Sequence, residues 1–183
     1  IKDSNSFLSK KNRLVWRGAA WQKHRKDFLE QHFSNPLCDV AQVNSSGDFA
    51  YGERLTIEQQ LRFKFILCIE GNDVATNLKW AMSSNSLCFM TKPKFETWFM
   101  EGQLKPGVHY VELADDFSDL DEKINYYSSQ TDEALQIIDN AHKHVALFQN
   151  KKIEDLISML VMEKYFHLSG QMSSCFQNGF LLK

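Results

Sequence analysis

Short apolar runs alternate with stretches of helical spacing between residues 13 and 113, and this alternation restricts the fold more than any other feature of the chain. Each run is followed by glycine or polar residues, as buried strands usually are. The strand candidates span residues 13–16, 37–43, 64–70, 86–90 and 109–113. Because strands that alternate with helices are typical of a parallel sheet, we predict a Rossmann-like α/β fold with helices flanking a doubly wound sheet.

The segments between and after these runs carry helix signals. Thr56 and Gln59 have the spacing of a capping box, and Gly102 has the position of a glycine C-cap. The helices are predicted over residues 21–33, 56–63, 73–84, 94–102, 118–129, 131–149 and 152–168. The strands and helices together predict a single domain over residues 1–183.

Length and composition restrict the class of protein. A chain of 183 residues with 43% hydrophobic content can bury one good core. Its formal net charge of -2 argues against a general nucleic-acid binder, because phosphate binding needs a surplus of cations. No apolar run approaches the roughly 18 residues that a membrane-spanning helix needs. The first residue is Ile1 and no signal-peptide pattern follows, so we expect a fragment that lacks an N-terminal part.

Charge and cysteine are unevenly placed. Residues 1–26 contain eight cationic residues and one acidic residue, Asp3. Residues 112–139 contain nine carboxylates and one cationic residue, Lys123. The basic segment could attract an anion. The four cysteines form no CxxC pair, so we expect free thiols and a reducing compartment; they are Cys38, Cys68, Cys88 and Cys175.

Two junctions between a strand and the next helix have the features of an anion site. The first contains Arg17 and Gly18 at a strand end, with Arg25 about two turns into the next helix; the second contains Gly71 and the helix start over residues 72–79. Ligands of open α/β sheets lie at such strand ends, where helix N-termini present free N–H groups. We therefore predict that the two junctions hold a diphosphate from two sides.

The residues leave alternatives open at both junctions. Glycine is common in such turns for backbone reasons alone, Asp73 could act only as an N-cap, and Arg17 could pair with a neighbouring carboxylate. Neither junction matches GxGxxG or the P-loop pattern.

Other candidate sites are better explained by structure. His142 and His144 point to different sides of a helix and cannot share a metal ion well. Acidic residues such as Asp119 and Asp121 are favoured in the first turn of a helix, so the sequence DLD does not indicate a metal site. The aromatic residues Trp80, Trp98 and Phe99 are expected in the core.

Three strings of residues carry a family resemblance: EGNDVATNLKWAMSSNSLCFM, KPKFETWFMEGQLKPGVHYVEL and DDFSDLDEKINYY. With LVWRGAAWQKHRKDF they resemble glycosyltransferase family 90, which contains bacterial lipopolysaccharide core transferases and eukaryotic protein O-glucosyltransferases. The resemblance runs from residue 12 to residue 168. In LVWRGAAWQKHRKDF, Lys26 separates Arg25 from Asp27, where the family has an Arg-Asp-like step.

The resemblance implies the C-terminal, donor-binding half of a two-lobed transferase of the B type. It implies a nucleotide-sugar donor, UDP-hexose, with no permanently bound cofactor and no metal. The donor-contacting residues that it implies are Arg17, Gly18, Arg25, Gly71, Asn72, Val74, Ala75, Thr76, Asn77 and Lys79. Asn77 departs from the eukaryotic members, which have an arginine there. The catalytic base would belong to the missing N-terminal lobe, so no catalytic residue is predicted.

The function implied is transfer of a hexose to a glycan or glycolipid acceptor, in the synthesis of lipopolysaccharide or another surface polysaccharide. The segment ETWFMEG and the expected free cysteines favour the bacterial branch of the family and a cytoplasmic enzyme. The basic N-terminal segment favours peripheral contact with the inner face of the bacterial inner membrane. Two alternatives remain. One is a non-catalytic nucleotide-sugar-binding or scaffold domain, and the other is an oxidoreductase, which the missing glycine fingerprint disfavours.

Overall fold

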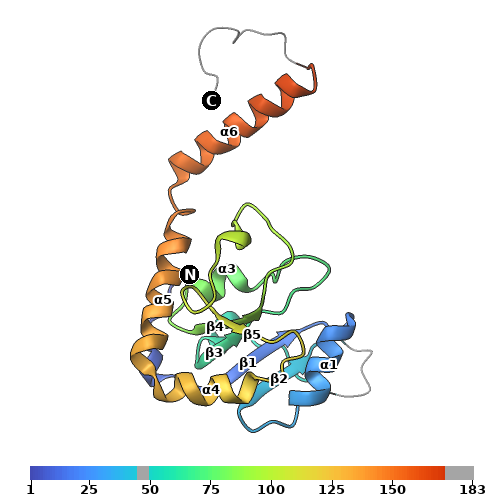
Figure 1. The fold of residues 1–183 in the computed structure, drawn as a ribbon, viewed down its shortest axis with the longest axis vertical. Helices are drawn as coiled ribbons and strands as arrows, with labels where there is room; N and C mark the ends of the chain where they lie inside the picture. The colour runs from blue at the N-terminus through green and yellow to red at the C-terminus, as the bar shows by residue number, and fades with distance from the viewer. Residues whose placement is uncertain (45–49, 172–183) are drawn as a thin grey trace. The chain divides into compact units, whose positions relative to one another are not determined.

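A five-stranded parallel sheet forms the centre of the computed structural model, which describes residues 1–44 and 50–171 (Figure 1). The strand order is β2-β1-β3-β4-β5, and each neighbouring pair is parallel. The strands are β1 (Lys11–Gly18), β2 (Cys38–Gln42), β3 (Phe63–Leu67), β4 (Leu87–Thr91) and β5 (Val111–Leu113). The α/β fold class and all five expected strands are confirmed.

The helices follow the expected order, but several are shorter than expected and one is replaced by a 3-10 turn. They are α1 (Lys23–His32), α2 (Ile57–Gln60), α3 (Leu78–Met82), α4 (Leu120–Ser129), α5 (Thr131–Ala146) and α6 (Lys151–Leu168), with 3-10 turns η1 (Phe7–Ser9) and η2 (Glu101–Gln103). The capping box before α2 is present: Thr56 accepts from the backbone of Gln59, and the Gln59 side chain accepts from the backbone of Thr56.

The helix expected from residue 73 was predicted too long. α3 begins only at Leu78, because the preceding residues form bends and the Asn77 side chain bonds to the carbonyl of Leu67 at 2.9 Å. Asp73 is therefore not an N-cap. The helix expected over residues 94–102 is also wrong, since only the short turn η2 forms there.

One face of the sheet carries most of the core. Strand residues such as Leu14, Phe65 and Phe89 are fully buried in one cluster with Phe28 of α1 and Ile124 of α4. Successive strand residues alternate between faces, so this face holds every second side chain. Each large apolar side chain buried here stabilises the fold by about 1.5–3 kcal/mol before entropy is counted. Helices α1, α4 and α5 all supply residues to this cluster.

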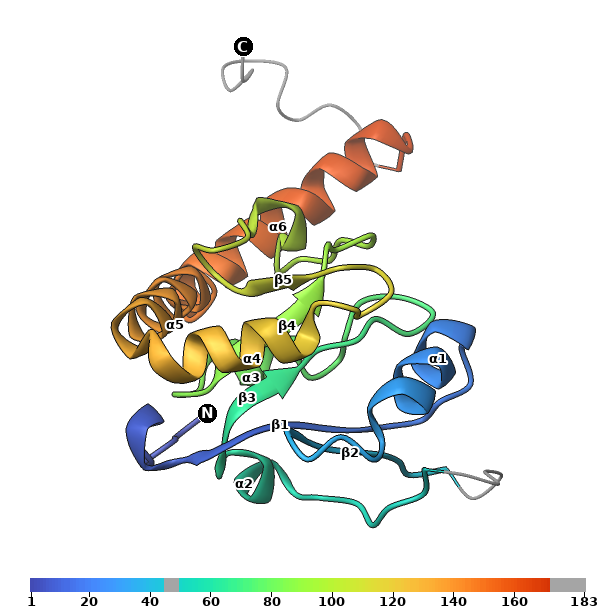
Figure 2. The same ribbon diagram turned by 60° about the horizontal axis from the view of Figure 1, so that its bottom comes forward.

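The strand order reverses direction between β1 and β3. From β1 the chain moves to β2 on one side, whereas β3 is followed by β4 and β5 on the other side (Figure 2). β1 and β3 are direct neighbours, with Leu14 opposite Phe65 and Val15 opposite Ile66. In doubly wound sheets, ligands bind at the carboxyl ends of the strands at this reversal point. The two junctions selected from the sequence follow these two strands.

The chain divides into two compact units, Ile1–Val145 and Ala146–Lys183. The first contains the sheet. In the second, Asn150 caps α6 by accepting from the backbone of Ile153, and no residue of α6 is buried. None of the helices within the described residues is long and apolar enough to cross a membrane. The single-domain expectation stays a prediction, because the positions of the two units relative to each other are not determined.

Three of the four thiols fit the sequence-based expectation. Cys38, Cys68 and Cys88 are free and buried. Burial raises the pKa of the Cys38 thiol to about 12, so this side chain is a neutral apolar group at physiological pH. Cys175 lies outside the described residues.

Candidate functional site

The guanidinium of Arg25, on α1, joins the two junctions. Its Nε donates to the carbonyl of Glu70 at 3.0 Å, and its Nη2 donates to the carbonyl of Ile69 at 2.8 Å. Its Nη1 donates to the carbonyl of Ala19 at 2.9 Å, in the turn after β1. One side chain thus ties the segment that follows β3 to the segment that follows β1. The two junctions therefore lie side by side, with Arg25 between them, and their contact with a diphosphate stays a prediction.

Neighbouring side chains reinforce this contact. Nε2 of His24 lies 2.9 Å from the same Glu70 carbonyl, and Nε2 of Gln22 donates to Oδ1 of Asn72 at 2.9 Å. A Cβ added at Gly71 would lie 3.2 Å from Nη2 of Arg25, so a side chain there would press on the guanidinium. Glycine at this position therefore allows the arginine to approach the backbone.

The charge of Arg25 has no carboxylate partner among the described residues. Burial lowers the pKa of Arg25 below its usual value, which still leaves the group cationic. The N-terminus of α1 adds to this positive potential, since its N-cap, Gln22, makes no side-chain cap bond and its first turn holds no acid. The edge between β1 and β3 is therefore a favourable place for an anion.

The segment after Gly71 offers backbone donors. The N–H of Gly71 itself bonds to the carbonyl of Asp73 at 2.9 Å, which makes a turn. Within the described part of the chain, the N–H groups of residues 72–77 have no acceptor. Asn72, Asp73 and Thr76 are exposed, whereas Val74 and Ala75 are buried. The expected row of donors is present, although a short turn rather than a long helix presents it.

Arg17 and Gly18 have structural roles of their own. Nη2 of Arg17 pairs with Oδ1 of Asp39 at 2.5 Å, and its Nε donates to the carbonyl of Glu53 at 3.0 Å. This pairing is the alternative that the sequence left open. A Cβ at Gly18 would lie only 2.5 Å from the ring of Trp16, which explains the glycine. Contact of Arg17 with a diphosphate stays a prediction and competes with this ion pair.

Lys79 is held by a carboxylate that the sequence did not single out. Its ammonium lies 3.3 Å from Oε1 of Glu101, 5.5 Å from the ring centroid of Trp98 and 5.4 Å from that of Phe99. Glu101 is only 1% exposed and accepts from the backbone N–H of Thr97 at 2.7 Å. Burial raises the pKa of this carboxyl, but the hydrogen bonds from Thr97 and Lys79 outweigh burial, so the pKa lies below its usual value. Glu101 is therefore ionised at neutral pH.

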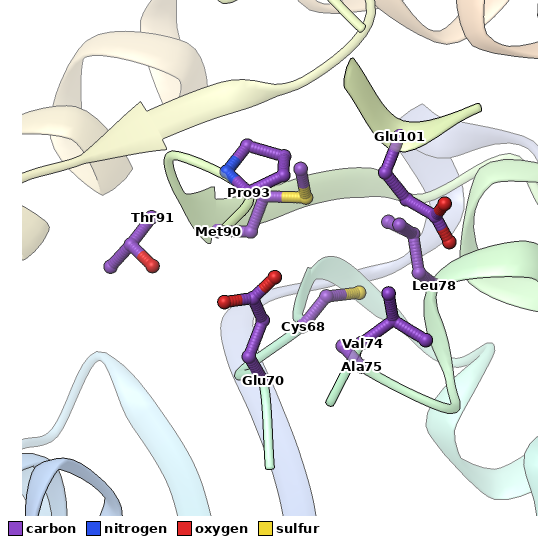
Figure 3. Close-up of a pocket in the computed structure, with 9 residues that line it drawn as sticks. All are labelled: Cys68, Glu70, Val74, Ala75, Leu78, Met90, Thr91, Pro93 and Glu101. Carbon is purple, nitrogen blue, oxygen red and sulfur yellow. The ribbon is translucent and has the colours of Figure 1, made fainter. Parts of the chain in front are cut away.

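The cavity beside these residues is too small for a nucleotide. Glu70 and Glu101 enter it from different segments, with Cys68, Val74 and Met90 also in its wall (Figure 3). Its volume of about 10 Å³ is room for one water molecule. A nucleotide at this edge would have to lie on the open surface.

A larger hollow lies between α1 and the loop that follows β5. Its volume is about 440 Å³, within the usual range for a ligand pocket. The lining contains four carboxylates, those of Asp27, Glu30, Asp115 and Asp116, together with His24. These carboxylates would repel an anion, so this hollow is a less favourable place for one than the surroundings of Arg25.

Most of the remaining candidate residues make contacts within the fold. His142 lies 2.8 Å from the carbonyl of Ser84, and His144 lies 3.0 Å from that of Phe99, so the two rings serve different segments. Asp119 pairs with Lys123 on α4. Phe99 is buried as expected, whereas Trp98 is 62% exposed, so the core expectation for Trp98 was wrong. No group of three metal-ligating side chains occurs among the described residues.

Backbone strain gathers at the same edge of the sheet. Outside the glycines, the described residues with left-handed backbone are Ala50, Met100 and Phe117. They lie in the loops after β2, β4 and β5 respectively. Such strained positions tend to cluster at functional sites, which is a second reason to look for a ligand at the carboxyl ends of the strands.

Comparison with known proteins agrees with the resemblance noted in the sequence. The family model for Glycosyl transferase family 90 matches residues 2–172, which is nearly the whole chain. The chain belongs to glycosyl transferase family 90. The described fold and the joined junctions are therefore features of a family 90 protein.

Two curated relatives and one solved structure are similar to this family 90 chain. It is 48% identical over 168 residues to "O-glucosyltransferase LpsA" of Dichelobacter nodosus, covering 91% of this chain and 53% of that protein. It is 26% identical over 134 residues to "Protein O-glucosyltransferase 2" of Danio rerio, covering 69% and 27%. A C-terminal domain of a glycosyl transferase group 1 family protein (LpcC) from Francisella tularensis has a TM-score of 0.49 and 13% identity, covering 73% of this chain and 83% of that one. The chain spans about half the length of the first relative.

Proposed function

We propose that this chain is the donor-binding part of a glycosyltransferase that moves a hexose from a nucleotide-sugar to a glycan or glycolipid acceptor. The observation that carries the proposal is the meeting of two strand-end junctions at Arg25, beside an uncapped helix N-terminus, in a family 90 chain. A relative named O-glucosyltransferase favours glucose as the hexose, with UDP-glucose as the donor to test first.

The proposed role of this edge is to hold the diphosphate that leaves. Negative charge grows on the diphosphate as its bond to the sugar breaks, and donors already aimed at it lower the barrier. The N–H groups of residues 72–77, those of the first turn of α1, and the unused N–H groups of Arg25 are the donors that we assign. Asn77 adds no charge, and Lys79 shares its charge with Glu101, so Arg25 is the main cation.

The acceptor site and the catalytic base are proposed to belong to a second lobe of the B-type arrangement. We assign no catalytic base among the residues of this chain. The alternative is a domain that binds a nucleotide-sugar without transferring the sugar. Binding alone does not separate the two, so a transfer assay has to accompany it.

The cellular role that we propose is synthesis of lipopolysaccharide or another surface polysaccharide in the bacterial cytoplasm, at the inner face of the inner membrane. The identity of 48% to a protein of Dichelobacter nodosus supports the bacterial assignment. Peripheral membrane contact has less support, because several cations of the basic segment serve the fold. Lys10 is buried against Asp3, and Arg17 pairs with Asp39.

Isothermal titration calorimetry of the full chain with UDP, UDP-glucose and UDP-galactose tests the proposal, with GDP and NAD as controls. We expect UDP and at least one UDP-hexose to bind and GDP and NAD to bind much more weakly. No binding of any UDP compound would contradict the proposal. Selective binding of NAD would favour the oxidoreductase alternative, and binding of UDP-glucose without transfer of glucose to a glycan acceptor would favour the scaffold domain.

A further inference from the structure

We propose that the exposed ring of Trp21 is the surface on which the base of the nucleotide-sugar stacks. This inference rests on the proposed function, since it names the part of the same edge that takes the base. It assigns a residue that neither the sequence motifs nor the family resemblance singled out.

The ring of Trp21 has no partner among the described residues. Its side chain is 62% exposed and takes part in no ring contact, cation–π contact or hydrogen bond there. Trp98 has the same exposed fraction, yet its ring packs against Phe99 and lies 5.5 Å from the ammonium of Lys79. Trp16 is 3% exposed and belongs to the core. Trp21 therefore differs from both in leaving its ring open.

The backbone on each side of Trp21 is held in place. Ala20 is buried, and its N–H donates to Oδ1 of Asn44 at 3.0 Å. Gln22 follows directly and donates from Nε2 to Oδ1 of Asn72 at 2.9 Å. The turn that presents the ring is thus tied both to the loop after β2 and to the segment after β3. A ring presented from a fixed turn offers a binding surface that needs no ordering.

The position of Trp21 in the chain fits a base rather than a sugar. It immediately precedes Gln22, the N-cap of α1, so the ring lies beside the N-terminus assigned to the diphosphate. A nucleotide base is planar, and any base can stack on an aromatic ring, whichever hydrogen-bond donors and acceptors it carries. A hexose needs several polar partners for its hydroxyl groups, and an indole offers only one N–H.

Affinity measurements on Trp21→Ala separate stacking from a general effect on the site. We expect the affinities for UDP and UMP to fall about tenfold, within the range found when a stacking aromatic is replaced by alanine. The affinity for inorganic diphosphate should stay within about twofold, because the ring does not contact phosphate. Trp21→Phe keeps an aromatic face and should lose less affinity than Trp21→Ala.

Tryptophan fluorescence supplies a second readout with a matched control. UDP should quench the emission of the wild-type chain, and Trp21→Phe should abolish most of that quenching. Trp98→Phe removes an indole of equal exposure and keeps an aromatic ring over Lys79, so it should retain the quenching. Thermal melts of the variants check that the fold is unchanged.

The outcomes are distinguishable. Unchanged UMP and UDP affinity in Trp21→Ala, with normal UDP binding by the wild type, would overturn the assignment of Trp21 and leave the proposed function standing. An equal loss of affinity for inorganic diphosphate would show a structural effect instead of stacking. A loss of affinity confined to UDP-glucose would place the sugar on the ring. Either result would overturn the assignment of Trp21 to the base. If the wild type binds no UDP compound, the proposed function fails and this assignment fails with it.

Discussion

Arg17 and Arg25 show how far the surroundings of a side chain decide its role. Both arginines belong to the same junction, and from the sequence either could contact a phosphate. Arg17 is neutralised by Asp39, whereas Arg25 donates to carbonyl oxygens, lies over the ring of Trp16 and has no carboxylate partner among the described residues. An anion gains more from the second arrangement, because no carboxylate competes for the guanidinium.

The contacts of Arg17 predict an effect on stability more than on binding. Arg17→Ala should lower the free energy of unfolding by about 1–3 kcal/mol, since it removes the donor to the Asp39 carboxylate and to three carbonyls. UDP affinity should change by less than about twofold. Urea unfolding and calorimetry measure the two quantities on the same sample. Asp39→Asn is the matched control, and a large loss of UDP affinity in Arg17→Ala alone would support the predicted contact of Arg17 with the diphosphate.

Arg25→Ala should lower both the free energy of unfolding and the affinity for UDP. It leaves the carbonyls of Ala19, Ile69 and Glu70 without this donor, so we expect the free energy of unfolding to fall by about 2–4 kcal/mol. UDP affinity should fall at least about tenfold, because the main cation of the edge is lost. Arg25→Lys keeps the charge but cannot reach three carbonyls at once. It should therefore recover part of the affinity and little of the stability. Unchanged UDP binding in a folded Arg25→Ala protein would contradict the site.

At the scale of elements, the loop between β4 and β5 is ordered by the buried carboxylate of Glu101. It accepts from Thr97 within the same loop and pairs with Lys79 on α3, so it connects a loop to a helix. A buried ionised group that has these partners stabilises one conformation strongly, because any other would leave it unpaired.

The lowered pKa of Glu101 predicts a pH dependence. Its folded pKa lies below the unfolded value, so the stabilisation is present above the unfolded pKa of about 4.3 and is lost as the pH falls through the folded pKa. Glu101→Gln should lower the free energy of unfolding by about 1–3 kcal/mol near pH 7, and the difference from wild type should shrink below about pH 4.3. Urea unfolding between pH 3 and 7 measures it. Glu96→Gln, in the exposed part of the same loop, should show no such difference. If the free energies of unfolding of Glu101→Gln and wild type differ by the same amount at every pH, the predicted role of the Glu101 charge is wrong.

The cap of α2 gives a smaller effect on an element. Thr56→Ala removes the acceptor for the backbone N–H of Gln59 and should lower the free energy of unfolding by about 1 kcal/mol. Thr56→Ser keeps the hydroxyl and should be nearly neutral. Equal losses for the two variants would show that the methyl group, and not the cap, matters.

At the scale of the whole molecule, the sheet unit carries its own core. Every residue of the main core cluster belongs to Ile1–Val145, and α6 buries none of its side chains. A chain ending at Gln149, before the Asn150 cap of α6, should therefore fold and melt within about 3 °C of the full chain. Differential scanning calorimetry checks this expectation. A loss of more than about 10 °C would show that the sheet unit depends on the segment removed.

The sequence predicted the strands well, because each buried run of a parallel sheet is visible as a local apolar pattern. It also selected the segments around Arg25 and Gly71 as two sides of one anion site, and the structure places these segments in contact. The position of β1 between β2 and β3 could not be predicted, since strand order depends on contacts between distant residues. The late start of α3 was missed because the Asn77 amide bonds to the carbonyl of Leu67, ten residues away. Glu101 was missed because nothing near it in sequence signals burial.

The contact of Arg25 with three carbonyls has a consequence for how quickly a ligand can be captured. The two segments that would receive the ligand are already joined in the free protein, so no loop has to close before the ligand is held. Association should then follow a single exponential phase whose rate rises linearly with ligand concentration, without the plateau that a slow rearrangement imposes.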